Sequence, residues 1–324
     1  MTGCFSDMKI AGISVCVPEN CVDNSAYGER FGEKRVRKHI ELTGVKIRHV
    51  LAGNQQPSDL ACAAGERVLN HLQWDRERLN CLVYVTQAPE YDKPATAFII
   101  QKRLQIGKEC LVFDVNLGCS GFVAGIQILS GLLQNCGGRG LLLIADSNCQ
   151  DERKNPVDQM LFGDAGCAVA LERIENHPIL YYHESDGTRF EVIHKERNGA
   201  GFMDGSKVFA FTLNDVVDSI KDAHNIFSIT DDDVDYYFFH QGQKMILDNL
   251  VELCQIPSEK VLYSIREYGN TSGVSIPVTI CANREIISAK KQIRSFMCGY
   301  GVGLSWGSLY LSLETKDILP IQLL

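Results

Sequence analysis

Short apolar runs rich in β-branched residues recur along the first half of the chain, and such runs are typical of buried strands. Longer segments between them place apolar residues near i, i+3 and i+4, which is the spacing of an amphipathic helix. The predicted strands are 10–17, 81–87, 110–118, 140–146 and 167–171, and the predicted helices are 59–72, 96–104 and 121–134. The last of these helices is apolar on almost every side, as a buried helix would be. Alternating strands and helices predict an α/β layered architecture.

The alternation starts again after a charged stretch at residues 172–206. The pattern then predicts helices at 212–225, 244–254 and 274–289, strands at 235–242 and 261–269, and a strand pair at 294–313. No residue-level repeat is visible, so the duplication is a matter of pattern alone. We therefore predict two similar halves, residues 1–174 and 175–324.

Composition narrows the class of protein. The chain has 324 residues, 45% of them hydrophobic and 22% charged, which is ordinary for a globular protein with a substantial core. Its formal net charge of −8 gives no sequence-wide basic footprint for nucleic acid. The longest apolar runs are well short of the ~20 residues that a membrane-spanning helix needs. We expect a soluble protein that binds neither nucleic acid nor membrane.

Cysteine usage and the known cofactor motifs add further expectations. The 13 cysteines include no C-x-x-C pair, and the first residues lack a charged segment followed by an apolar one, so we expect free thiols and a cytoplasmic location. The histidines are dispersed, with no ligand-like grouping, and no GxGxxG or P-loop is present. No metal and no nucleotide cofactor is therefore expected.

The first candidate for chemistry is Cys119, in the sequence DVNLGCSGF at 114–122. An apolar strand ends just before it and a buried helix begins directly after it. A cysteine at a helix start lies near amide donors and the positive end of the helix dipole, which favour thiolate over thiol. From the turn alone, Cys119 could instead be a small core residue.

Two further polar residues sit at the ends of predicted strands. His240 ends the strand DVDYYFFHQG, and Asn270 follows VLYSIREYG, just before a segment in which Pro277 suits the first turn of a helix. Alone, His240 could be a hydrogen-bonded structural histidine and Asn270 a turn former. Because catalytic groups gather beyond the carboxyl ends of strands in layered parallel sheets, the three together indicate an active site.

Five segments carry a resemblance to a known family. In chain order they are GCSGF at 118–122, FGDAGCAVAL at 162–171, HQG-x-x-x-I at 240–246, YGNTSG-x-SIP at 268–277 and GYGVGLSWGS at 299–308. Together they resemble β-ketoacyl-acyl-carrier-protein synthase III and related condensing enzymes. The resemblance spans almost the whole chain. It implies a thiolase-like α/β fold with a five-layered α-β-α-β-α arrangement of two duplicated halves, a homodimer, and acyl thioester substrates carried on coenzyme A or acyl carrier protein.

The resemblance also implies catalytic roles. Cys119 matches the nucleophile that accepts the acyl group, while His240 and Asn270 match the pair at which a malonyl group loses carbon dioxide. The backbone amides of Cys119 and Val302 match the oxyanion hole. The family pattern has glycine at the position of Val302, but a backbone donor survives that change.

Several residues match substrate-binding segments of the family. Met203, Gly205 and Phe209 match the segment that lines the pantetheine tunnel and acyl pocket, although Met and Phe also suit a core. Thr43 is a further candidate, because it lies in the segment that aligns with the coenzyme A region. The loop 88–97 resembles the one whose tip enters the acyl pocket of the other subunit, and Lys93 there is a candidate contact to a polar acyl group or a solvated charge.

Other positions depart from the family pattern. Lys38 and Pro156 stand where a tryptophan and an arginine commonly enclose the adenine of coenzyme A, which weakens the expectation of acetyl-coenzyme A as primer. Gln243 replaces an asparagine. Met245 occupies a position that is often basic in members that dock the acidic carrier protein, and Lys244 is adjacent.

Three functions remain open from the sequence. The leading hypothesis is decarboxylative Claisen condensation of an acyl group on Cys119 with a malonyl thioester. The alternative is acyl transfer from Cys119 to an oxygen, nitrogen or sulfur nucleophile, with His240 as general base and no decarboxylation. A catalytically silent subunit is the third, and the presence of Cys119, His240 and Asn270 together argues against it.

Overall fold

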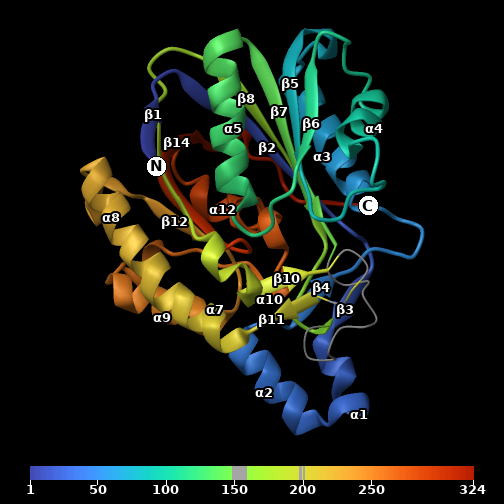
Figure 1. Ribbon diagram of the computed structural model, residues 1–324, viewed down its shortest axis with the longest axis vertical. Helices are drawn as coiled ribbons and strands as arrows, with labels where there is room; N and C mark the ends of the chain where they lie inside the picture. Colours follow the sequence, from blue (N-terminus) through green and yellow to red (C-terminus); the bar gives the residue numbers. More distant parts are fainter. Residues whose placement is uncertain (148–158, 197–198, 200) are drawn as a thin grey trace.

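The computed structural model describes residues 1–147, 159–196, 199 and 201–324, and two large sheets dominate it (Figure 1). The six-stranded sheet has the order β15-β2-β8-β7-β5-β6 and the five-stranded sheet has the order β1-β9-β14-β13-β12. The strands of the first sheet are β15 (Gln322–Leu323), β2 (Met8–Val17), β8 (Ala165–Arg173), β7 (Arg139–Asp146), β5 (Leu79–Val85) and β6 (Leu111–Val115). Those of the second are β1 (Thr2–Phe5), β9 (Ile179–Ser185), β14 (Ser305–Glu314), β13 (Gln292–Gly301) and β12 (Tyr236–Phe239).

Helices lie between the sheets and on both outer faces, which gives five layers in the order α-β-α-β-α (Figure 1). The central layer contains α5 (Gly121–Cys136) and α11 (Ser275–Ala282), and α12 (Arg284–Ile287) follows α11. The outer face of the six-stranded sheet is covered by α3 (Pro57–Leu72) and α4 (Thr96–Arg103). The other outer face is covered by α7 (Gly205–Phe211), α8 (Val217–Phe227) and α9 (Lys244–Cys254). The layered α/β arrangement expected from the sequence is confirmed.

The central layer explains why the predicted helix at 121–134 is apolar all round. The core around α5 combines side chains from both sheets, such as Val83 and Met297, with Phe122 of the helix itself. Each of these three side chains is fully buried. Burial of apolar surface on both faces of each sheet therefore holds the start of α5, and Cys119 before it, at a defined point between the sheets.

Smaller elements complete the described chain. The helices α1 (Gly28–Phe31) and α2 (Glu33–Thr43) lie at one end of the molecule, and they connect the antiparallel pair β3 (Cys21–Asp23) and β4 (Ile47–His49) (Figure 1). The strands β10 (Ile193–Lys195) and β11 (Gly201–Met203) pair antiparallel before α7. No helix in the described part of the chain is both long and apolar enough to span a membrane. Every cysteine in that part is a free thiol.

The sequence boundary near residue 175 falls between β8 and β9, which belong to different sheets. The two ends of the chain, however, exchange sheets. The N-terminal β1 pairs with β9 in the five-stranded sheet, and the C-terminal β15 pairs with β2 in the six-stranded sheet. The two sheets are therefore tied together at both ends of the chain.

The predicted strand at 261–269 is wrong. Only an isolated bridge between Val261 and Tyr237 is present, and residues Ile265–Tyr268 form the short helix α10. Strand pairing ends because the Ser264 amide donates to the side chain of Gln241, at 3.2 Å, instead of to a neighbouring strand. The Gly269 amide then donates to the Ile265 carbonyl over 2.9 Å, which closes a helical turn.

Candidate active site

Cys119 lies between the end of β6 and the start of α5, under the turn that joins β13 to β14. That turn approaches so closely that a Cβ on Gly301 would stand 2.7 Å from the Cys119 Cβ and 3.1 Å from its sulfur. The amides of Cys119 and Val302 both donate hydrogen bonds toward the sulfur. The structure therefore places the two expected oxyanion-hole amides at the candidate nucleophile.

Burial raises the pKa of the Cys119 thiol to about 12, and the negative charge of Asp146 acts in the same direction. The Ser272 hydroxyl and the amides of Cys119 and Val302 oppose this rise without overcoming it. Burial therefore opposes the thiolate that the helix start was expected to favour. Desolvation disfavours the charged sulfur more than the nearby donors favour it.

His240 follows β12 directly, and its side chain is buried. Its amide donates to the Cys298 carbonyl over 2.9 Å, and its Nδ1 lies 2.7 Å from the Ser275 hydroxyl oxygen. The Tyr300 ring packs edge-on against the imidazole. Burial lowers the pKa of His240 to about 4, with a hydrogen bond to the Ser272 backbone acting in the opposite direction. The imidazole is therefore neutral at pH 7.

Asn270 is held by the segment 161–163. Its backbone amide donates to the Leu161 carbonyl at 2.9 Å, and its backbone carbonyl accepts from the Gly163 amide at 3.1 Å. This approach requires glycine, because a Cβ on Gly163 would stand 2.0 Å from the Tyr268 carbonyl oxygen. Because the predicted strand before Asn270 is absent, this backbone pairing positions the residue instead.

The side chain of Asn270 is fixed at one end and loosely held at the other. Its Oδ1 accepts from the Ser272 amide at 3.0 Å, whereas its Nδ2 makes only a 3.5 Å contact with the Gly242 carbonyl. Gly242 is two residues beyond His240, so the Asn270 amide group lies beside the turn that carries the imidazole. The structure thus brings the two predicted partners together.

Sequence reasoning missed a buried polar chain next to Cys119. The Ser272 hydroxyl donates to Asp146 Oδ2 over 2.8 Å. Asp146 Oδ1 accepts from the Gln87 backbone amide at 2.6 Å and from the Thr86 hydroxyl at 3.3 Å. Burial raises the pKa of Asp146 to about 6. A signal was present, since Asp146 is a carboxylate at the end of the apolar strand 140–146, the same placement that drew attention to Cys119.

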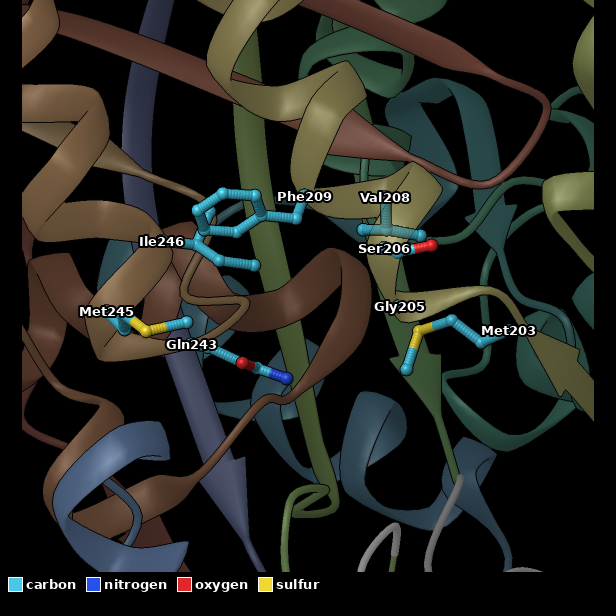
Figure 2. Close-up of a pocket in the computed structure, with 8 residues that line it drawn as sticks. All are labelled: Met203, Gly205, Ser206, Val208, Phe209, Gln243, Met245 and Ile246. Carbon is cyan, nitrogen blue, oxygen red and sulfur yellow. The ribbon is translucent and has the colours of Figure 1, made fainter.

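A cavity of about 400 Å³ opens beside the start of α9 (Figure 2). Three of the predicted substrate-binding residues, Met203, Gly205 and Phe209, lie on its wall. The other lining residues are Ser206, Val208, Gln243, Met245 and Ile246. The lining is mainly apolar, and the departures at Gln243 and Met245 therefore face the same space as the predicted pocket residues.

The remaining candidates lie elsewhere. Thr43 is buried at the end of α2, where its hydroxyl donates to the His39 carbonyl at 2.8 Å, so it is not on the wall of this cavity. Lys93 is exposed in the loop 88–97 and does not line the cavity either. Lys38 is exposed on α2, and Pro156 lies outside the described residues. Within the described residues, no three His, Cys, Asp or Glu side chains are grouped as metal ligands.

Comparisons with known proteins agree with this geometry. Residues 113–187 match the family described as 3-oxoacyl-[acyl-carrier-protein (ACP)] synthase III, and residues 227–313 match the C-terminal region of the same family. The crystal structure of a 3-oxoacyl-(acyl-carrier protein) synthase from Burkholderia xenovorans LB400 is 31% identical, with a TM-score of 0.95 over 100% of this chain and 99% of the other.

Relatives of known sequence agree as well. A putative 3-oxoacyl-[acyl-carrier-protein] synthase 3 of Campylobacter jejuni is 26% identical over 97% of both chains. The β-ketoacyl-[acyl-carrier-protein] synthase III of Staphylococcus saprophyticus is 29% identical over 94% of this chain and 98% of its own. Because the match to the Burkholderia structure covers the whole chain at 31% identity, and the family matches span positions 119, 240 and 270, the chain belongs to the 3-oxoacyl-[acyl-carrier-protein] synthase III family of thiolase-fold condensing enzymes.

Proposed function

We propose that the protein catalyses decarboxylative Claisen condensation between an acyl group on Cys119 and a malonyl thioester. Cys119 first takes the acyl group from a thioester and releases the carrier thiol. The malonyl group then loses carbon dioxide, and the electrons of the broken carbon–carbon bond form an enolate. The enolate carbon attacks the acyl carbonyl, and the Cys119 sulfur leaves to give a β-ketoacyl thioester.

The observation that supports this function best is the neutral, buried His240 beside Asn270. Nδ1 lies beside the Ser275 hydroxyl, and we assign the ring proton of the neutral imidazole to Nε2, the tautomer that would donate to substrate. Donors aimed at a developing oxyanion in a site without water are among the strongest contributions to catalysis. Nε2–H of His240 and Nδ2–H of Asn270 would therefore stabilise the enolate oxygen.

The low pKa of His240 also bears on the alternative function. Transfer of the acyl group to an alcohol, amine or thiol needs a general base, and a base works best when its pKa is near the working pH. A pKa of about 4 makes the imidazole a weak base at pH 7. The site therefore suits enolate stabilisation better than base-catalysed acyl transfer.

An acyl carrier protein is the partner that we propose for at least one substrate. Such carriers are acidic, and α2 presents Lys34, Arg35, Arg37 and Lys38 on exposed positions. Helix α2 packs against α9, which begins at Lys244 beside the cavity of Figure 2. These cations stand on the helix that packs against α9, in a chain that is acidic as a whole, and they would attract an acidic carrier to this side of the molecule.

We also propose that the protein is a homodimer. The strand β6 is an edge of the six-stranded sheet, and Leu111 on it is exposed. Phe98, at the start of α4 and just after the loop 88–97, is also exposed. An open strand edge with large apolar side chains is a ready surface for pairing with a second copy. Light scattering at micromolar concentration tests this, and a fully active monomer would refute it.

Intact-protein mass measurement tests the reaction. The protein is incubated with a panel of acyl thioesters on coenzyme A and on carrier protein, and the added mass is mapped to Cys119. The acylated protein is then given a malonyl carrier labelled in its free carboxyl group. Release of labelled carbon dioxide with loss of the acyl mass supports condensation. Loss of the acyl mass to an alcohol or amine, with no carbon dioxide from any malonyl thioester, supports the alternative.

A further inference from the structure

The buried contact between Ser272 and Asp146 has no part in the reaction as described so far. Ser272 lies next to the candidate nucleophile, since its hydroxyl favours the ionised form of the Cys119 sulfur by hydrogen bonding and lies 3.6 Å from the point where a Cβ on Gly118 would stand. The same hydroxyl donates to Asp146 Oδ2 at 2.8 Å. Both Ser272 and Asp146 are almost fully buried.

The direction of these hydrogen bonds makes a continuous chain. While the single proton of the Ser272 hydroxyl points to Asp146, its oxygen can accept the thiol proton of Cys119. Once the sulfur is ionised, the hydroxyl donates to it instead, and this is the hydrogen bond that lowers the pKa of the thiol. The chain therefore runs from sulfur to hydroxyl to carboxylate, each group donating to the next. By contrast, the Nδ1 atom of His240 is hydrogen-bonded to the Ser275 hydroxyl, so this nitrogen is not part of the chain from Cys119.

Ser272 is held in this place by its backbone. It adopts a left-handed conformation with φ of 52°, which is unfavourable for a residue other than glycine. Its amide is anchored to Asn270 Oδ1 at 3.0 Å, and a Cβ on the next residue, Gly273, would stand 2.8 Å from the Gly118 carbonyl oxygen. Strained conformations of this kind persist where surrounding contacts impose them, and they concentrate at functional sites.

We propose that Ser272 and Asp146 form a proton relay for Cys119, with Ser272 as a further catalytic residue and Asp146 as the positioning residue that acts through it. As the sulfur attacks a thioester carbonyl, its proton moves to the Ser272 oxygen while the Ser272 hydroxyl proton moves to Asp146. A carbon–sulfur bond forms to Cys119 and the one to the carrier breaks. The proton then returns through Ser272 to the departing carrier thiolate. This inference rests on the proposed function of Cys119 as acyl acceptor.

The electrostatic surroundings of Asp146 fit this role. Burial raises the pKa of its carboxyl group to about 6, so that it is ionised at pH 7 and is a better proton acceptor than an exposed aspartate. The titratable groups that act on it or respond to its charge are Asp164, which raises its pKa further, and the un-ionised Cys119 and Tyr84. The Thr86 hydroxyl and the Gln87 amide oppose the rise.

Alkylation of Cys119 by iodoacetamide tests the relay without any acyl substrate. The rate at Cys119 is followed by peptide mass from pH 5 to pH 10, in wild-type protein and in Asp146→Asn. With a relay, the wild-type rate rises through pH 6 and then levels, while in Asp146→Asn this rise is lost and the rate at pH 7.5 falls by about 100-fold. If Asp146 acts only as a charge, its removal lowers the pKa of Cys119 and the rate increases. An increased or unchanged rate would therefore overturn the proposal.

Two more variants separate the relay from a structural role. Ser272→Ala should lose the same rise, and the double variant with Asp146→Asn should be no slower than either alone, because one pathway is removed only once. Thr86→Val is the matched control, since it removes a hydrogen bond to the same carboxylate outside the path to Cys119. It should keep the rise but move it to higher pH. Independent, additive losses would count against the relay.

These results do not depend on condensation. A protein that shows the expected alkylation profiles but never releases carbon dioxide from a malonyl thioester would retain the relay and lose the proposed function. A protein that condenses normally, yet alkylates as fast in Asp146→Asn and Ser272→Ala as in wild type, would retain the function and lose the relay. Thermal unfolding of each variant shows that the folded protein is being measured.

Discussion

Replacing Asn270 with alanine is expected to stop release of carbon dioxide from a malonyl thioester while leaving acylation of Cys119 largely intact. The Asn270 Nδ2 makes only a 3.5 Å contact with the Gly242 carbonyl, so this donor is available to an enolate oxygen. Loss of one such donor typically lowers a rate by ~10²–10³, or about 2.7–4 kcal/mol of transition-state stabilisation. Acylation instead uses the sulfur, the backbone amides of Cys119 and Val302, and the proposed relay through Ser272 and Asp146, none of which the substitution removes.

The structure supplies a control, because the Asn270 side chain has two tasks. Its Oδ1 also accepts from the Ser272 amide at 3.0 Å, and alanine loses this acceptor as well. Asn270→Asp keeps the acceptor and removes the donor. Labelled carbon dioxide and intact mass are measured on both variants. If Asn270→Ala decarboxylates as fast as wild type, the assignment is wrong. If only alanine is impaired, Asn270 serves to hold Ser272 and does not bind the enolate.

Three other predictions follow from the same contacts. Gly301→Ala should slow acylation by at least about 100-fold, because the added Cβ would stand 3.1 Å from the Cys119 sulfur and must displace it. Stopped-flow measurement of acylation tests this, and an unchanged rate would show that the turn moves away from the sulfur. Decarboxylation by pre-acylated protein should be constant from pH 8 to pH 5 and fall only as the pH approaches 4, where His240 takes up a proton; a step near pH 6.5 would contradict the neutral imidazole. Gly163→Ala should reduce the free energy of unfolding by about 1–3 kcal/mol in a denaturant titration, because its Cβ would stand 2.0 Å from the Tyr268 carbonyl oxygen, and an unchanged midpoint would show that the loop can move.

Much of the architecture could be predicted from periodicity alone. The apolar spacing at 244–254 gave the bounds of α9, and the runs at 10–17 and 140–146 correspond to β2 and β7 within two residues. Hydrophobic periodicity works here because each element must bury one or both faces against a neighbouring layer. The candidate nucleophile could also be identified from the sequence, since Cys119 lies between a predicted buried strand and a predicted buried helix.

Local pattern was misleading where a side chain replaced backbone pairing. Residues 261–269 alternate well enough to suggest a strand, but Gln241 takes the Ser264 amide and the chain turns into α10 instead. The position of Asn270 then depends on its pairing with the distant segment 161–163. A single sequence cannot show such pairing, because the two partners are separated by more than 100 residues.

The sequence by itself determined the layered α/β class, most of the helices and strands, and which cysteine, histidine and asparagine are the candidates for the site. Only the tertiary structure decided their chemical state and their neighbours. Cys119 stands at a helix start that favours a thiolate, yet burial between two sheets raises the pKa of its thiol to about 12. Likewise, Ser272 and Asp146 come together across 126 residues of chain. Desolvation and long-range contact depend on what surrounds a group in space, and periodicity along the chain carries no record of either.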